Sequence, residues 1–168
     1  MSGLGVSVTA SASDTAGTPV LPSLYCELAA GPSSVRTARH RVRERYGGCG
    51  SPDLIDDLAL VVTELVANAV AASPVTASVR LRVGPVGPDL LIEIYDQATE
   101  VPVGRGQEDL AEHGRGLVLI AELCRSWGWH PSDRGKVVWA VIRVAGTGSS
   151  ATAMPSAAPS AEPPPVLS

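Results

Sequence analysis

The sequence predicts an α+β fold, a two-layer α/β sandwich in which helices pack on one face of a mainly antiparallel sheet. The main observation is the order of its elements: a strand, two helices, two strands, a loop, a helix and two strands. The composition suits a globular domain, because 45% of the 168 residues are hydrophobic. The chain has no phenylalanine, and only 4% of its residues are aromatic. We therefore expect a core of aliphatic side chains.

The first part of the patterned segment predicts a strand followed by two helices. Residues 21–28 form a short, mostly apolar run that is typical of a strand. Apolar residues recur at helical spacing over 35–46, and two glycines then interrupt the pattern. The next helix is expected to start after Ser51, whose hydroxyl can cap it, and to extend to about Ala72.

The middle part predicts a hairpin and a loop. Residues 77–83 and 90–95 are apolar or alternating runs, and the stretch 84–88 between them has the Gly- and Pro-rich composition of a hairpin connection. The stretch 99–113 has no strong period and contains proline and glycine, so we expect it to be a loop. Long loops in compact domains are usually functional.

The last part predicts a helix and a second pair of strands. Apolar residues at helical spacing indicate a helix over 117–127. Two strands are expected over 127–130 and 137–144, and Arg134 with Gly135 suits a turn between them.

The composition of the ends predicts one folded domain between two tails. Residues 1–20 are rich in Ser, Gly, Thr and Ala, and residues 146–168 are rich in Ala, Ser and Pro. Such segments lack the apolar pattern that a packed core needs, so both tails are expected to be disordered. The domain is therefore expected over residues 21–145.

Charge and composition exclude several classes of protein. Thirteen basic and seventeen acidic residues give a net charge of -4, which argues against direct, general binding of nucleic acid. No apolar run approaches the roughly 20 residues that a membrane helix needs, and the start of the chain lacks an export signal. Three cysteines without metal-ligand spacing favour reduced thiols. We expect a cytoplasmic protein with no direct nucleic-acid or membrane contact.

Glu64 and Asn68 are the first candidate pair of functional residues. They are four residues apart in the second predicted helix, so a carboxylate and an amide project from the same face. Asn is unfavourable inside a helix and therefore calls for a reason. Oxygen ligation of Mg²⁺ is one such reason, and a solvated helix face is the alternative.

Two other segments are candidates for ligand contacts. Gly114, Arg115 and Gly116 precede the predicted third helix, where unpaired N–H groups could hold phosphate, although glycines also simply end loops. Asp96 ends an apolar strand and could either accept a hydrogen bond from an exocyclic amino group or cap the next turn. Lys136 could touch a phosphate, but a lysine in a turn is more often solvated.

In this order, the segments resemble the ATP-binding domain shared by gyrase, the large heat-shock chaperones, histidine kinases and mismatch-repair ATPases. The sequence is more similar to the stand-alone anti-sigma-factor serine kinases of Bacteria, of the actinobacterial type. Residues 57–70 resemble their N box, and Asp96 with Pro102 resembles their adenine-binding box. The other matching segments are 114–117, which resemble the second glycine box, and 127–128 with 135–139, which resemble the closing hairpin.

The resemblance spans about 24–144 and implies a histidine kinase-like ATPase fold with ATP and Mg²⁺ as cofactors. It implies that Asn68 coordinates Mg²⁺, that Glu64 is the general base and that Asp96 binds the adenine amino group. The stretch 99–113 would be the ATP lid. The phosphate contacts that it implies are those of Gly114, Arg115 and Gly116.

The resemblance also implies a regulator of transcription. Such a protein binds a sigma factor or phosphorylates a serine or threonine of an anti-sigma antagonist. A nucleotide-binding interaction module without phosphoryl transfer is an alternative, as is a detached histidine-kinase ATPase domain, and a homodimer is left open. Two places depart from the family pattern. The segment 71–74 stands where many relatives have a basic or His residue, and Val137 stands where a threonine is common.

The first predicted helix carries a run of basic residues. Its arginines are opposed within the helix only by Glu44. This run could bind a partner protein, contact DNA or be solvated, and the acidic net charge disfavours DNA. The arginines concerned are Arg36, Arg39, Arg41, Arg43 and Arg45.

Overall fold

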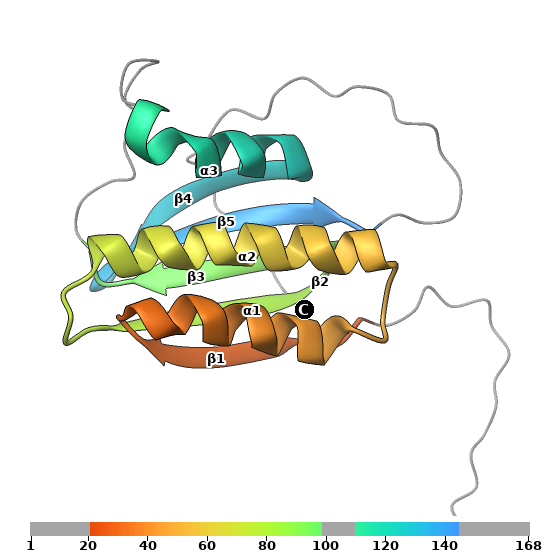
Figure 1. The fold of residues 1–168 in the computed structure, drawn as a ribbon, viewed down its shortest axis with the longest axis horizontal. Helices are drawn as coiled ribbons and strands as arrows, with labels where there is room; N and C mark the ends of the chain where they lie inside the picture. Colours follow the sequence, from red (N-terminus) through yellow and green to blue (C-terminus); the bar gives the residue numbers. More distant parts are fainter. Residues whose placement is uncertain (1–20, 99–109, 145–168) are drawn as a thin grey trace, which may run out of the picture.

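A computed structural model describes residues 21–98 and 110–144 of the chain. Within these residues an antiparallel five-stranded sheet has the order β1-β2-β3-β5-β4, and the helices lie on one face of it (Figure 1). The predicted α+β sandwich is thereby confirmed. The elements are β1 (Leu24–Ala29), α1 (Pro32–Tyr46), α2 (Pro52–Ala72), β2 (Ser78–Val86), β3 (Asp89–Asp96), α3 (Leu110–Leu123), β4 (Cys124–Ser132) and β5 (Gly135–Arg143).

The predicted tails and part of the predicted loop are outside the described residues. These segments are 1–20, 99–109 and 145–168. Pro102 of the expected adenine-binding box is among them. None of the described helices is long and apolar enough to cross a membrane.

Helices α1 and α2 form where the sequence predicts them. The hydroxyl oxygen of Ser51 accepts a hydrogen bond from the backbone N–H of Leu54 at 3.2 Å, which caps α2. α1 starts at Pro32, because proline at the first helical position lacks only an N–H that has no partner there. At the other end of α1, the buried Tyr46 donates a hydrogen bond to the carbonyl of Pro22 at 2.6 Å. This bond ties α1 to the chain just before β1.

The hairpin between β2 and β3 is tighter than expected. Residues 84–86 of the expected connection belong to β2 and pair with β3. The chain reverses at Gly87, whose φ of 55° favours glycine. Pro85 is tolerated because β1 pairs with β2 only as far as Val83, so β2 has an unpaired edge at that point among the described strands.

The third helix differs most from the expectation. α3 begins at Leu110, within the predicted loop, and therefore includes the glycine segment that was expected to precede it. It ends before Cys124, which pairs with Ile142 of β5 as the start of β4. Strand pairing thus replaces the helical pattern that the apolar residues suggest. The β4–β5 turn lies at Asp133 and Arg134, one residue earlier than predicted.

An aliphatic core fills the space between the helices and the sheet, as the composition predicts. Alternate strand residues point toward the helices, and they meet the buried face of α2. The aromatic side chains of Tyr46 and Trp127 are also part of this core. Its most completely buried aliphatic members include Leu58, Val61, Val62, Val66, Leu81, Leu90, Ile92, Ile94 and Ile120.

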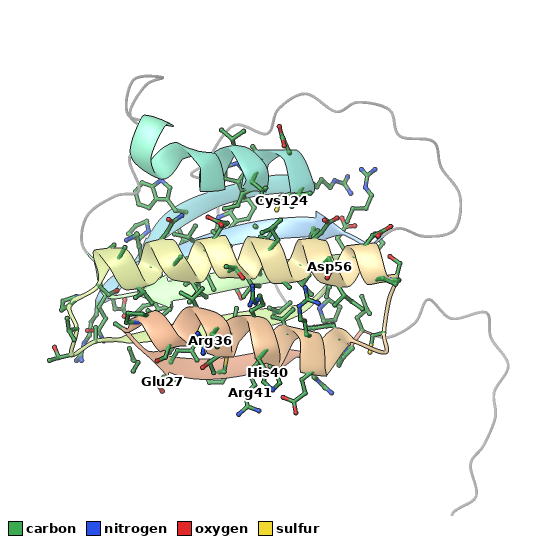
Figure 2. The ribbon with its side chains drawn as sticks, in the orientation of Figure 1. Glu27, Arg36, His40, Arg41, Asp56 and Cys124 are labelled. Carbon is green, nitrogen blue, oxygen red and sulfur yellow. The ribbon has the colours of Figure 1, made fainter. Side chains whose placement is uncertain are left out.

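The three cysteines are free thiols, as predicted. Cys124 is buried at the start of β4 on the helix-facing side of the sheet (Figure 2). Burial raises the pKa of its thiol to about 12, and the negative charge of Asp57 contributes to the rise.

Candidate functional site

Asp96 lies at the end of the sheet where β3 stops and β5 begins. The register of these antiparallel strands places Asp96 opposite Lys136. Ile92 and Ile94 face the helices, and side chains alternate along a strand, so Asp96 faces the helices as well. The C-terminal part of α2 and the start of α3 lie at the same end of the molecule (Figure 1). Segments far apart in the sequence therefore lie at the end of the molecule that carries Asp96.

The carboxylate of Asp96 is buried and uses only one of its two oxygens. The exposed fraction of the residue is 0%. Oδ1 accepts hydrogen bonds from the backbone N–H of Ala98 at 2.9 Å and from Nζ of Lys136 at 2.8 Å. Oδ2 is buried and has no hydrogen-bond partner among the described residues. A buried acceptor without a donor is unfavourable, so Oδ2 is suited to a donor group of a ligand.

Both interpretations of Asp96 that the sequence allowed are compatible with this geometry. The hydrogen bond from the Ala98 N–H caps the turn that follows β3. It uses Oδ1 alone and leaves Oδ2 available. An exocyclic amino group is a donor of the kind that Oδ2 lacks.

Lys136 is buried, so the expectation of a solvated lysine in a turn is wrong. It lies in β5, and only 6% of its surface is exposed. In the ion pair with Asp96, the side chains of Lys136 and Asp96 are 7% and 1% exposed. Sequence reasoning missed this partnership. The available signal was that the chain contains a single lysine, which directly follows a glycine at the start of a predicted strand.

Gly135 permits the close approach that brings Lys136 to Asp96. A Cβ at position 135 would overlap the carbonyl oxygen of Asp96 and lie 2.8 Å from the Cα of Gln97. The φ of Gly135 is 158°, at the border of the region that favours glycine. Glycine is therefore required here because the start of β5 packs directly on the backbone that leaves β3.

Glu64 on α2 packs against Gly116 on α3. Glu64 is half-buried, and a Cβ at position 116 would overlap its Oε2 atom. Among the described residues, no hydrogen bond or ion pair holds the Glu64 carboxylate. The structure thus brings together two of the predicted site residues and leaves the carboxylate without a described partner.

Asn68 lies one helical turn beyond Glu64 and is exposed. The stripe that holds both residues is not a plain solvated face, because Val61 on it is fully buried. Asp57, further along the stripe, is half-buried. Desolvation by burial raises the pKa of its carboxyl, and the charges of Asp53 and Asp56 raise it further. No group of three or more His, Cys, Asp or Glu residues that could hold a metal occurs in the described part of the chain.

The expectation that Gly114, Arg115 and Gly116 precede a helix is wrong. α3 begins at Leu110, so these residues lie within the helix. The unpaired N–H groups of a helix belong to its first four residues, and this segment follows them. The backbone of the segment therefore does not form the phosphate cradle expected at a helix start. The close contact with Glu64 gives Gly116 a different structural reason.

The basic residues of α1 divide into those with described partners and those without. Arg43 forms an ion pair with Asp56 of α2 at 2.7 Å, and Arg41 forms one with Glu44 at 3.3 Å. Arg45 donates a hydrogen bond to the carbonyl of Ser23 at 3.0 Å. The remaining basic side chains of α1 are exposed, and Figure 2 labels Arg36 and His40 among them. They are Arg36, Arg39 and His40.

Comparison with known families agrees with the geometry. The model of the histidine kinase-like ATPase domain matches residues 28–142, a range that includes all three helices, β2 to β4, and β5 except for its last residue. No curated protein matches the chain.

Proposed function

The chain belongs to the histidine kinase-like ATPase domain family, and from this premise we propose that it is an ATP-binding regulator of a partner protein. The partner would be a sigma factor that it binds or an anti-sigma antagonist that it phosphorylates on serine or threonine. One observation carries the proposal: Oδ2 of Asp96 is buried without a described donor at the end of β3. The amino group of adenine is such a donor.

The residues of α2 suit the chemistry of phosphoryl transfer. When bound, ATP with Mg²⁺ supplies the phosphoryl group and the counter-charge. Asn68 is exposed on α2, and its amide oxygen would hold Mg²⁺. Glu64 would orient the hydroxyl of the partner and accept its proton, since its carboxylate has no described partner.

Partner binding is assigned to α1. Arg36, Arg39 and His40 are exposed on this helix and have no described ion pair. An acidic surface on the partner would complement them, and such complementarity mainly raises the rate of association.

A second candidate is a nucleotide-binding interaction module without phosphoryl transfer. This second candidate is favoured by residues 71–74, at and just beyond the end of α2, because they carry no basic or His side chain. Both candidates require ATP binding. They differ in whether radiolabelled γ-phosphate passes to a serine or threonine of a partner from the source genome.

Calorimetric titration with ATP and Mg²⁺ tests the shared requirement. We expect binding by the full chain. We expect Asp96→Asn to weaken it by about 1–3 kcal/mol, because an amide NH2 group replaces one acceptor oxygen of the buried carboxylate. The matched control is Asp89→Asn. Asp89 is a buried carboxylate on the same strand, and it pairs with Arg125 instead of Lys136. Its replacement should leave ATP affinity unchanged.

Two results would contradict the proposal. One is equal affinity for ATP in the wild type and in Asp96→Asn. The other is the absence of binding at millimolar ATP.

A further inference from the structure

The single lysine of the chain is the basic residue that lies against Asp96. The other twelve of the thirteen basic residues are arginines. The described arginines that form ion pairs have side chains more than half exposed, whereas the side chain of Lys136 is 7% exposed. Burying a charge is unfavourable unless it is paired, so a specific role for an ammonium at this position is indicated.

A lysine makes a different pair with a carboxylate than an arginine does. The arginine fork typically binds both oxygens of a carboxylate at once, whereas an ammonium is a point donor with three N–H groups. Lys136 accordingly contacts Oδ1 of Asp96 and leaves Oδ2 without a partner. An arginine at this position would compete for the oxygen that the ligand needs.

The pair therefore presents a donor and an acceptor next to each other. One N–H of the ammonium is directed to Oδ1, and the described residues supply no second acceptor for Nζ. Oδ2 supplies the acceptor. Both groups belong to adjacent strands whose register is set by the β3–β5 ladder. The donor and the acceptor are therefore held by the sheet.

We propose that Lys136 recognises the base of the nucleotide by donating a hydrogen bond to the ring nitrogen N1 of adenine. Asp96 accepts a hydrogen bond from the adjacent amino group. This inference rests on the proposed function, because it requires a nucleotide whose base lies against Asp96. Adenine carries a donor and an acceptor side by side on this edge, which matches the pair. Guanine and hypoxanthine carry a carbonyl and an N–H there instead. In the same orientation, guanine or hypoxanthine would place its carbonyl oxygen against Oδ2 of Asp96, acceptor against acceptor. Its N–H would lie against the ammonium of Lys136, donor against donor.

The test compares ATP with 1-deaza-ATP, which has carbon in place of N1 and keeps the amino group. We expect the full-length wild type to bind 1-deaza-ATP about 10- to 100-fold more weakly than ATP, the range for a hydrogen bond to a charged group. In Lys136→Met the two ligands should bind equally. The matched control is Arg134→Met, which removes an exposed positive charge from the neighbouring turn. It should keep the full preference for ATP.

A second measurement does not depend on a variant. Because the chain has one lysine, a protein with isotope-labelled lysine gives one side-chain ammonium signal by NMR. ATP should shift this signal, and 1-deaza-ATP should shift it much less. This readout keeps the proposal testable if Lys136→Met does not fold.

The outcomes separate this inference from the proposed function. Equal affinity of the wild type for ATP and 1-deaza-ATP would overturn the role of Lys136 and leave ATP binding intact. A preference for ATP that persists in Lys136→Met would also overturn it. A third ligand, the ATP analogue that keeps N1 but lacks the amino group, tests the hydrogen bond to Asp96 alone. If none of the three ligands binds, both proposals are overturned.

Discussion

Gly116 of α3 lies against the carboxylate of Glu64 on α2, so closely that any side chain at position 116 would overlap Oε2. The overlapping atom is the end of a flexible side chain, which can move away. The contact therefore limits where the carboxylate lies more than it limits the helix.

Gly116→Ala should displace Glu64 without unfolding the protein. Alanine is better than glycine inside a helix by about 1 kcal/mol, so we expect the free energy of unfolding to stay level or rise slightly. If Glu64 is the base of phosphoryl transfer, as proposed, transfer should also fall, because its carboxylate moves. The measurements are thermal unfolding and transfer of labelled phosphate, and in a Glu64→Ala background the second substitution should have no further effect. A large loss of stability would show that the backbone, not the side chain, absorbs the overlap.

Glu64→Ala should separate binding from transfer. If Glu64 takes the hydroxyl proton, its loss should reduce transfer by roughly 10²–10⁴-fold and leave ATP affinity unchanged. Asn68→Ala should instead weaken Mg²⁺-dependent ATP binding. Transfer at the wild-type rate in Glu64→Ala would reject the base assignment, and binding of a partner without transfer would favour the interaction module.

The Asp96–Lys136 ion pair should be strongly coupled in stability. Lys136→Met leaves a buried carboxylate unpaired, and we expect it to lower the free energy of unfolding by about 3–5 kcal/mol. The double variant Asp96→Asn/Lys136→Met should recover most of that loss. Urea unfolding measures both.

The control for this cycle is the pair of Arg43 and Asp56. Both of its side chains are more than half exposed, at 52% and 62%. Arg43→Met should therefore lower the free energy of unfolding by only about 0–1 kcal/mol. A loss as large as that of Lys136→Met would show that burial does not distinguish the two pairs.

The free energy of unfolding should fall at alkaline pH. Burial raises the pKa of Cys124 from 9.0 to about 12 and that of Tyr46 from 10.0 to about 12. Each neutral group contributes stability that is fully present below its unfolded pKa and is lost as the pH rises through the folded value. Urea unfolding between pH 8 and pH 11 should show the decline, and Cys124→Ala should reduce it. An identical decline in that variant would exclude the thiol as a cause.

Local elements could be predicted from the sequence because they depend on neighbouring residues. The cap of Ser51, the extent of α2 and the aliphatic alternation of the strands follow from short-range spacing and side-chain chemistry. The start of α3 could not be predicted, because it lies within the stretch 99–113, which has no strong period. The end of α3 was misplaced because Cys124 continues the helical pattern but pairs with Ile142.

Of the candidate site, the sequence alone determined the residue types and two of the segments that carry them: Glu64 on a helix and Asp96 at the end of a strand. The glycine segment was expected before the third helix and lies within it. The tertiary structure decided which of them meet. Lys136 is 40 residues from Asp96 in the chain, and only the β3–β5 register and the absence of a side chain at Gly135 bring them to 2.8 Å. No local pattern encodes such a contact, because its energy depends on burial and on a partner that another strand supplies.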